Sequence, residues 1–114
     1  MIRYDDFAEL EITIGTIMEV AVVEGTDKLL KLIVDCGEDK PRQIISGIRL
    51  YVADPQTLVG QECTFLTNLE HRTIRGYESE GMLLAAHALG DENRPDTFAL
   101  LIPSVDVSVG TRVR

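Results

Sequence analysis

The stretch from Glu11 to Ile48, EITIGTIMEVAVVEGTDKLLKLIVDCGEDKPRQIISGI, decides the fold of this chain. Apolar residues alternate with polar or small ones along three of its segments, 11–23, 30–36 and 42–48. A period of two is typical of β-strands with one buried face, and turn residues between the segments indicate where each strand ends. We therefore predict three consecutive strands, with Gly15 as a candidate for a bend or bulge in the first.

Similar signals follow the third strand. Asp54 and Pro55 begin a short predicted helical turn that ends at Gly60. Further strands are predicted at 63–66, 82–88 and 97–102. Five or six short strands, with one brief helix between the third and the fourth, are typical of a small closed β-barrel of the oligonucleotide-binding (OB) type. A two-sheet sandwich would have a similar number of strands, but the position of the helical turn favours the barrel.

Length and charge limit the kind of protein. The 114 residues form one predicted domain, 1–114, with one modest core. The net charge of −8 argues against nucleic acid as a ligand, because phosphate contacts supply most of that affinity. The charge is unevenly spread, however: residues 1–27 carry −6, 28–75 carry +1 and 76–114 carry −3. This distribution is compatible with a local basic face on an acidic protein.

Cysteine content and hydropathy indicate the compartment. Cys36 and Cys63 lack CxxC spacing, and we expect buried reduced thiols rather than a disulfide or a metal pair. No apolar run approaches the roughly 18 residues that span a bilayer. The acidic N-terminal segment MIRYDDFAELE is unlike a secretory signal. We predict a cytoplasmic protein without a membrane partner.

Motifs for catalysis are missing from the sequence. It has no P-loop, no nucleophile elbow, and no HExxH or other metal-ligand spacing. A solvated acidic surface explains its many carboxylates. We therefore predict a protein that is not an enzyme and that uses no cofactor or metal.

The stretch from Asn68 to Ala86, NLEHRTIRGYESEGMLLAA, indicates a binding site. It combines a basic pair, Arg72 and Arg75, with a glycine-flanked polar loop at 76–81 and an uncharged apolar run. A solvated charge run does not need glycines on both sides, and a core strand does not need two arginines before it. We predict a loop that presents hydrogen-bonding groups to a ligand and then enters the sheet.

Six segments carry a resemblance to a known family: ITIGTIMEV, TDKLLKLIVDCG, RQIISGI, LVGQE, NLEHRTIRGYESEGMLLAA and VGTRV. In this order they cover nearly the whole chain, and it resembles the tRNA-binding domain found at the C-terminus of many bacterial methionyl-tRNA synthetases and as small stand-alone proteins. The resemblance implies an all-β, five-stranded OB-fold barrel with a C-terminal extension that supports a homodimer. It also implies non-catalytic binding of the outer corner, or elbow, of tRNA by shape and backbone.

Nine residues are the candidate RNA contacts: Lys28, Lys31, Arg42, Ser46, Asn68, Arg72, Arg75, Ser79 and Met82. The lysines would contact phosphates, and alternation places Arg42 and Ser46 on one face as an exposed polar pair. Ser79 and Met82 are candidates because they match family positions on the tRNA-contacting face. Each residue also has a structural interpretation. The lysines could be merely solvated, Asn68 could cap a turn, Met82 could lie in the core, and the arginines could pair with neighbouring glutamates.

Two positions depart from the family. Thr13 stands where the family usually has Arg, and Glu70 stands where Lys is common. Both remove positive charge close to the expected binding face, so a weaker or different RNA preference stays open. With only six aromatic residues in the chain, a structured RNA is favoured over an extended single strand.

Three functional hypotheses follow. The leading one is a non-catalytic tRNA-binding module that acts alone or supports the catalytic chain of a methionyl-tRNA synthetase. The alternative is a dimeric, peptide-binding protein like the export-chaperone relatives of the same fold, which the acidic net charge favours. A third is a subunit that dimerises a larger enzyme.

The C-terminal segment predicts a homodimer. After Pro103 the valines at 105, 107, 109 and 113 are more than one small barrel has room to bury, and exposed apolar patches usually mark an interface. The alternative is that the segment folds back over its own barrel.

Overall fold

The computed structural model describes every residue from Met1 to Arg114. In chain order the elements are α1 (Tyr4–Ala8), β1 (Ile12–Val22), β2 (Leu30–Asp35), β3 (Arg42–Ser46), the 3-10 turns η1 (Arg49–Tyr51) and η2 (Pro55–Leu58), β4 (Glu62–Leu66), β5 (Arg72–Ile74), β6 (Tyr77–Ser79), β7 (Met82–Leu83), β8 (Ala85–Ala88) and β9 (Thr97–Leu100). None of its helices has the length and apolar character required to cross a membrane.

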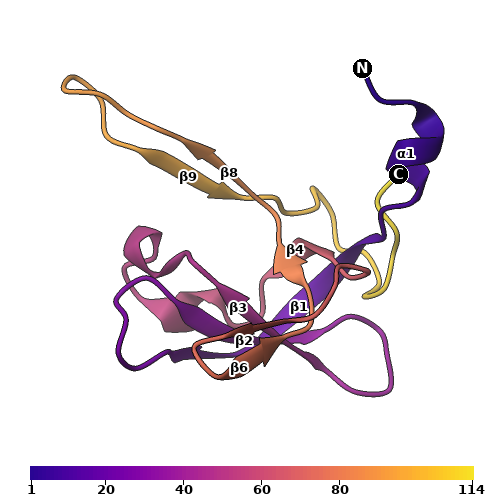
Figure 1. Ribbon diagram of the computed structural model, residues 1–114, viewed down its shortest axis with the longest axis horizontal. Coiled ribbons are helices and arrows are strands. Elements are labelled where there is room, and N and C mark those ends of the chain that lie inside the picture. Colours follow the sequence, from indigo (N-terminus) through magenta and orange to yellow (C-terminus); the bar gives the residue numbers. More distant parts are fainter.

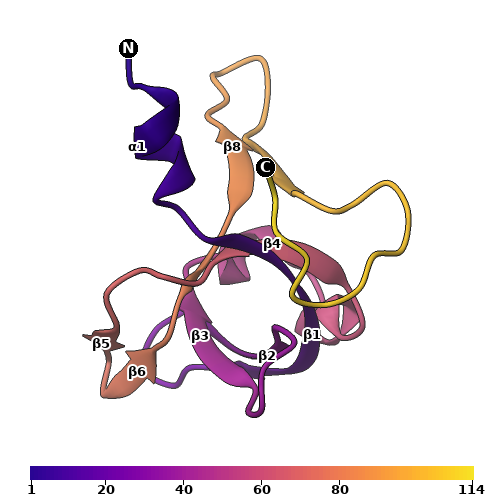
Figure 2. The ribbon, with the colours of Figure 1, turned by 90° about the vertical axis from the view of Figure 1, so that its right-hand side faces the viewer.

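Five antiparallel strands curl into a barrel in the order β3-β2-β1-β4-β7. The long strand β1 serves two partners: its first half pairs with β4 and its second half with β2. Viewed along the axis, β1, β2, β3 and β4 form a ring (Figure 2). The predicted all-β, five-stranded OB-like barrel is confirmed.

The bend in β1 lies at Met18, where the register with β2 shifts between Ile17 and Glu19. The prediction that Gly15 forms the bulge is wrong, since Gly15 sits in regular register opposite Cys63. Glycine is needed there for packing instead. A Cβ at this position would lie 2.8 Å from Val34 Cγ1 and 3.1 Å from Phe65 Cδ2.

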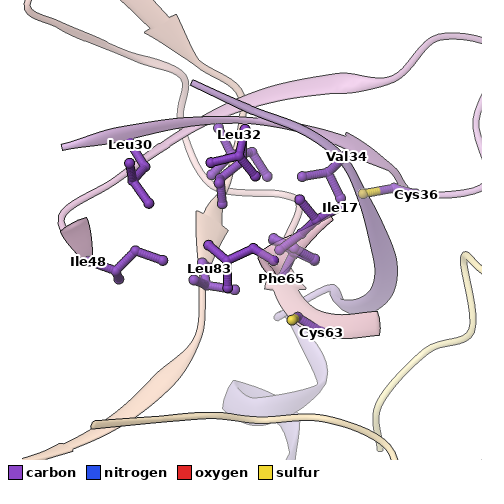
Figure 3. Close-up of a cluster of buried hydrophobic side chains, with 12 residues drawn as sticks. Ile17, Leu30, Leu32, Val34, Cys36, Ile48, Cys63, Phe65 and Leu83 are labelled. Carbon is purple, nitrogen blue, oxygen red and sulfur yellow. The ribbon is translucent and has the colours of Figure 1, made fainter. Parts of the chain in front are cut away.

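The core inside the barrel is aliphatic apart from Phe65 and the two cysteines, as the composition requires (Figure 3). Ile17, Leu32 and Ile44 are fully buried around Phe65. Both cysteines are free and buried, which confirms the prediction of reduced thiols. Burial raises the pKa of Cys36 and of Cys63 to about 11.

The connection between β3 and β4 contains the expected helical turn. The carboxylate of Asp54 accepts a hydrogen bond of 3.1 Å from the N–H of Gln56, and Gly60 has a φ of 91° just after the turn. β3 ends at Ser46 rather than at residue 48, because Arg49 begins a separate 3-10 turn.

The β8–β9 hairpin leaves the barrel and projects from it as an arm (Figure 1). The predicted strand 82–88 is therefore two strands. β7 pairs with β4 through Leu83, and from Ala85 onward the chain pairs with β9. At the base of the arm, the ring of Phe98 stacks on Tyr51 of η1 at 5.1 Å.

The C-terminal segment returns to the barrel and pairs with the start of β1. The N–H of Gly110 donates to the carbonyl of Ile14 at 2.8 Å, and the N–H of Val113 donates to that of Ile12 at 2.8 Å. The fold-back alternative therefore holds for residues 110–113. Val105, before this pairing begins, stays 68% exposed.

Candidate nucleic-acid interface

The predicted binding loop is a β-hairpin formed by β5 and β6. Ile74 pairs with Tyr77, which leaves Arg75 and Gly76 as a two-residue turn. Their φ angles of 53° and 84° are those of a type I′ turn. Arg75 is the only residue other than glycine with a positive φ, a conformation that disfavours most side chains. The chain thus holds a long cationic side chain at the hairpin tip at some cost in backbone strain.

The hairpin lies against the outside of the barrel beside β3 (Figure 2). The N–H of Glu80 donates to the carbonyl of Gln43, and the N–H of Ile45 donates to Ser79 Oγ. These two bonds show that β6 runs antiparallel to β3. The tip therefore extends toward the end of β3 at Ser46, where the β1–β2 loop at 23–29 also lies, because Leu30 pairs with Ser46.

Four of the nine candidate contacts are cations that form no ion pair in the structure: Lys28, Lys31, Arg72 and Arg75. All are exposed except Lys31, which is half-buried on β2. The salt-bridge cluster that would have given Arg72 and Arg75 a structural role is not formed. The strand 2–3 face, with the loops at this end, is the surface that OB folds use for oligonucleotides.

Ser79 is buried and holds the barrel closed. Its hydroxyl accepts from the N–H of Ile45 at 3.0 Å and donates to the carbonyl of Gly81 at 3.1 Å. No regular ladder joins β3 to β7; the bond from Ile45 to Ser79 crosses this seam, together with the backbone bond from Glu80 to Gln43. The hydroxyl both accepts and donates within the chain, so its hydrogen bonds are already used without a ligand.

The prediction of an exposed Arg42–Ser46 pair is wrong. Both side chains share the parity of Ile44, and that parity faces the barrel interior. Ser46 is buried, with 8% of its surface exposed. Arg42 lies at the barrel end, where its guanidinium donates to the carbonyls of Thr67 at 2.8 Å and Glu80 at 2.7 Å.

Arg42 also forms a bidentate ion pair with Glu38, with N–O distances of 2.6 and 2.9 Å. The hydrogen bond from Arg42 lowers the pKa of Glu38 below its ordinary value, and the same bond raises the pKa of Arg42. The guanidinium thus joins the β2–β3 turn, the end of β4 and the start of β7. The guanidinium therefore ties these three segments together at one end of the barrel.

Asn68 joins the end of β4 to the N-terminal segment. Its amide oxygen accepts from the N–H of Glu11 at 2.8 Å, and its amide nitrogen donates to the carbonyl of Glu9 at 2.7 Å. The side chain is exposed, but both ends of its amide are engaged. The amide therefore has a structural role, but it joins two distant segments and does not cap a local turn as the structural interpretation expected.

Met82 is 42% exposed, and it lines a small recess of about 50 Å³ with Arg72 and Glu70. Of the two departures from the family, Glu70 is therefore beside a candidate cation. Thr13 is not on this surface: it is buried, and its hydroxyl lies 3.0 Å from that of Thr67.

The sequence analysis missed Tyr77, which follows the hairpin turn. The residue is 37% exposed, and the Nζ of Lys31 lies 5.2 Å from the ring centroid. The signal in the sequence was an aromatic residue directly after Arg75-Gly76. Its proximity to Lys31 could not be seen, because the two residues lie 46 positions apart and meet only across β3.

Comparison with known proteins identifies the family. A model of the "Putative tRNA binding domain" matches residues 12–112. The chain belongs to the tRNA-binding domain family. It is 40% identical over 114 residues, its full length, to the methionine–tRNA ligase of Methanosarcina mazei, and it spans 15% of that protein.

Solved structures share the fold. A protein of Pyrococcus horikoshii described as related to methionyl-tRNA synthetase has a TM-score of 0.85 at 32% identity, with 100% of this chain and 98% of that chain covered. The chaperone CsaA of Bacillus anthracis has a TM-score of 0.82 over 100% of this chain and 99% of that chain. Its identity of 24% shows a common fold and does not favour the chaperone hypothesis.

Proposed function

We propose that this chain is a single, non-catalytic tRNA-binding domain that contacts RNA through the end of the barrel formed by the β5–β6 hairpin, β2 and the β1–β2 loop. One observation carries the proposal: Lys28, Lys31, Arg72 and Arg75 belong to this surface and form no ion pair, although the chain has 19 acidic residues. Cations left unpaired in an acidic protein are available to phosphates.

The arrangement favours recognition of shape and backbone. Arginine grips phosphate bidentately and lysine binds it as a point charge. A hairpin tip and a neighbouring loop can contact separate parts of a folded RNA, such as the outer corner of tRNA. Family membership supports this ligand, and RNA recognition by shape is the usual mode for structured molecules.

The wider role is also a proposal. The chain matches only 15% of the methionine–tRNA ligase of Methanosarcina mazei, so it would act either alone or as a support for the catalytic chain of such an enzyme. In both cases the domain would raise the local concentration of tRNA rather than perform chemistry. Its place would be the cytoplasm, where tRNA is used.

The proposed assembly is a homodimer. Apolar side chains remain exposed along the arm and the segment after it: Leu89 (82%), Leu101 (42%), Ile102 (58%) and Val105 (68%). A second copy would cover them and present two RNA-binding ends on one particle. Light scattering at micromolar concentration should give a dimer, and the double substitution Ile102→Asp and Val105→Asp should give a monomer. A monomeric parent protein would rule the dimer out.

Salt-dependent binding of unfractionated tRNA tests the function. Three or four phosphate contacts predict a slope of roughly −2 to −4 in log Kobs against log salt. Arg72→Ala should make the slope shallower by about one, whereas Arg94→Ala, in the turn of the β8–β9 arm, should leave it unchanged. An unfolded polypeptide serves as the competing ligand. Affinity that ignores salt, or binding of the polypeptide but not of tRNA, would exclude this function.

A further inference from the structure

Five of the six aromatic residues lie in the core or contact another aromatic ring. Phe65 is fully buried in the core. Tyr4 packs against Phe7 within α1, with ring centroids 6.4 Å apart. Tyr51 stacks on Phe98 at the base of the arm. The remaining residue, Tyr77, contacts no other ring and lies on the proposed RNA surface.

The Tyr77 ring lies under the ammonium of a lysine. The ammonium of Lys31 lies 5.2 Å from the ring centroid, within the range of a cation–π contact. The backbone under the ring is also fixed, since the carbonyl of the next residue, Glu78, accepts a hydrogen bond of 3.0 Å from the Gln43 amide. A ring positioned in this way, on a residue that is still 37% exposed, is preorganised to receive a ligand.

We propose that Tyr77 and Lys31 together bind one unpaired nucleotide of the RNA, with its base stacked on the exposed part of the Tyr77 ring and its phosphate held by the Lys31 ammonium. This inference rests on the proposed tRNA binding and adds a feature that the RNA must have. Base–aromatic stacking accepts any base, because every base has a π-face.

The surroundings favour a nucleotide over a paired helix. A hairpin tip carrying Arg75 stands next to the ring in the sequence, and it offers a second phosphate contact. On the other side of Lys31, a shallow groove of about 290 Å³ is lined by Val20, Ala21 and Ile33 together with Glu19. The Glu19 carboxylate repels phosphate, which favours a backbone path on the Tyr77 side of Lys31. Bases of a duplex are stacked inside the helix and cannot reach the ring, whereas an unpaired base can.

Fluorescence reports the stacking directly. The chain contains no tryptophan, so Tyr77→Trp introduces a single fluorescent probe. Tyr4→Trp introduces a matched probe on α1, away from the proposed RNA surface. Unfractionated tRNA should quench the probe at position 77 and leave the probe at position 4 unchanged. A fully paired RNA duplex of similar length should quench neither.

Affinity provides the second measurement. Tyr77→Phe should keep tRNA binding within about twofold, because the ring remains. Tyr77→Leu keeps an apolar side chain but no π-face, and it should weaken binding roughly 5- to 100-fold. The melting temperatures of both variants show whether they are folded.

The outcomes separate the two proposals. If the parent protein binds tRNA with the expected salt dependence while the folded Tyr77→Leu variant binds equally well, the nucleotide site is excluded and the proposed function stands. Equal quenching by the duplex, or by an unfolded polypeptide, also overturns the inference. If tRNA does not bind at all, both proposals fall.

Discussion

Substitution of Ser79 by alanine removes one hydrogen bond that crosses the barrel seam, from Ile45, and one within the same segment, to Gly81. The N–H of Ile45 and the carbonyl of Gly81 would then be buried without this partner. A buried donor or acceptor left unsatisfied costs about 1–3 kcal/mol. Because relaxation of the short strand β7 recovers part of this, we expect a loss of about 2 kcal/mol. In a domain of this size that lowers Tm by about 8 °C.

Thermal unfolding followed by circular dichroism measures the effect. Ser104→Ala is the matched control: Ser104 is exposed, and its loss should change the stability by less than about 0.5 kcal/mol. At 15 °C below the Tm of Ser79→Ala, the variant should still bind tRNA within about twofold of the parent protein. A variant with unchanged Tm but lost tRNA binding would show that the hydroxyl contacts RNA, and it would refute the assignment of Ser79 to barrel closure.

Three other substitutions or modifications test separate features. Arg75→Asn should keep Tm or raise it by up to about 4 °C, because Asn tolerates a positive φ, while tRNA binding weakens; a fall in both would make Arg75 structural. Glu70→Lys replaces an acid beside Arg72 with a base, and we expect up to about tenfold tighter tRNA binding at low salt with a slope steeper by about one; unchanged binding would place Glu70 outside the contact area. Cys36 and Cys63, with pKa values of about 11, should resist iodoacetamide at pH 8 in the folded protein, since almost no thiolate exists below the pKa, and react after unfolding; rapid alkylation of the native chain would contradict their burial.

The candidate site was predictable where the chemistry is local. Arg75 lies in the hairpin turn beside a glycine that is visible in the sequence, and Arg72 begins the strand before that turn; a two-residue hairpin needs only neighbouring residues. For Arg42 and Ser46, alternation gave the correct shared face but not its direction. Ile44 stands between them and faces the core, so the same parity that suggested a polar pair on the outside places both side chains toward the interior or the barrel end.

The sequence by itself determined the strands of the barrel and the capped turn before β4, because alternation and turn chemistry act over a few residues. The family was indicated by the resemblance of six segments along the chain. Only the tertiary structure decided which polar side chains are free to bind. Ser79 meets Ile45 across 34 positions, and Asn68 reaches Glu9 across 59. In the sequence, a serine or asparagine that makes such a contact cannot be told from one whose side chain is free to bind RNA. The two differ in whether a distant segment of the folded chain already satisfies the hydrogen bonds of the side chain, and only the tertiary fold brings that segment close.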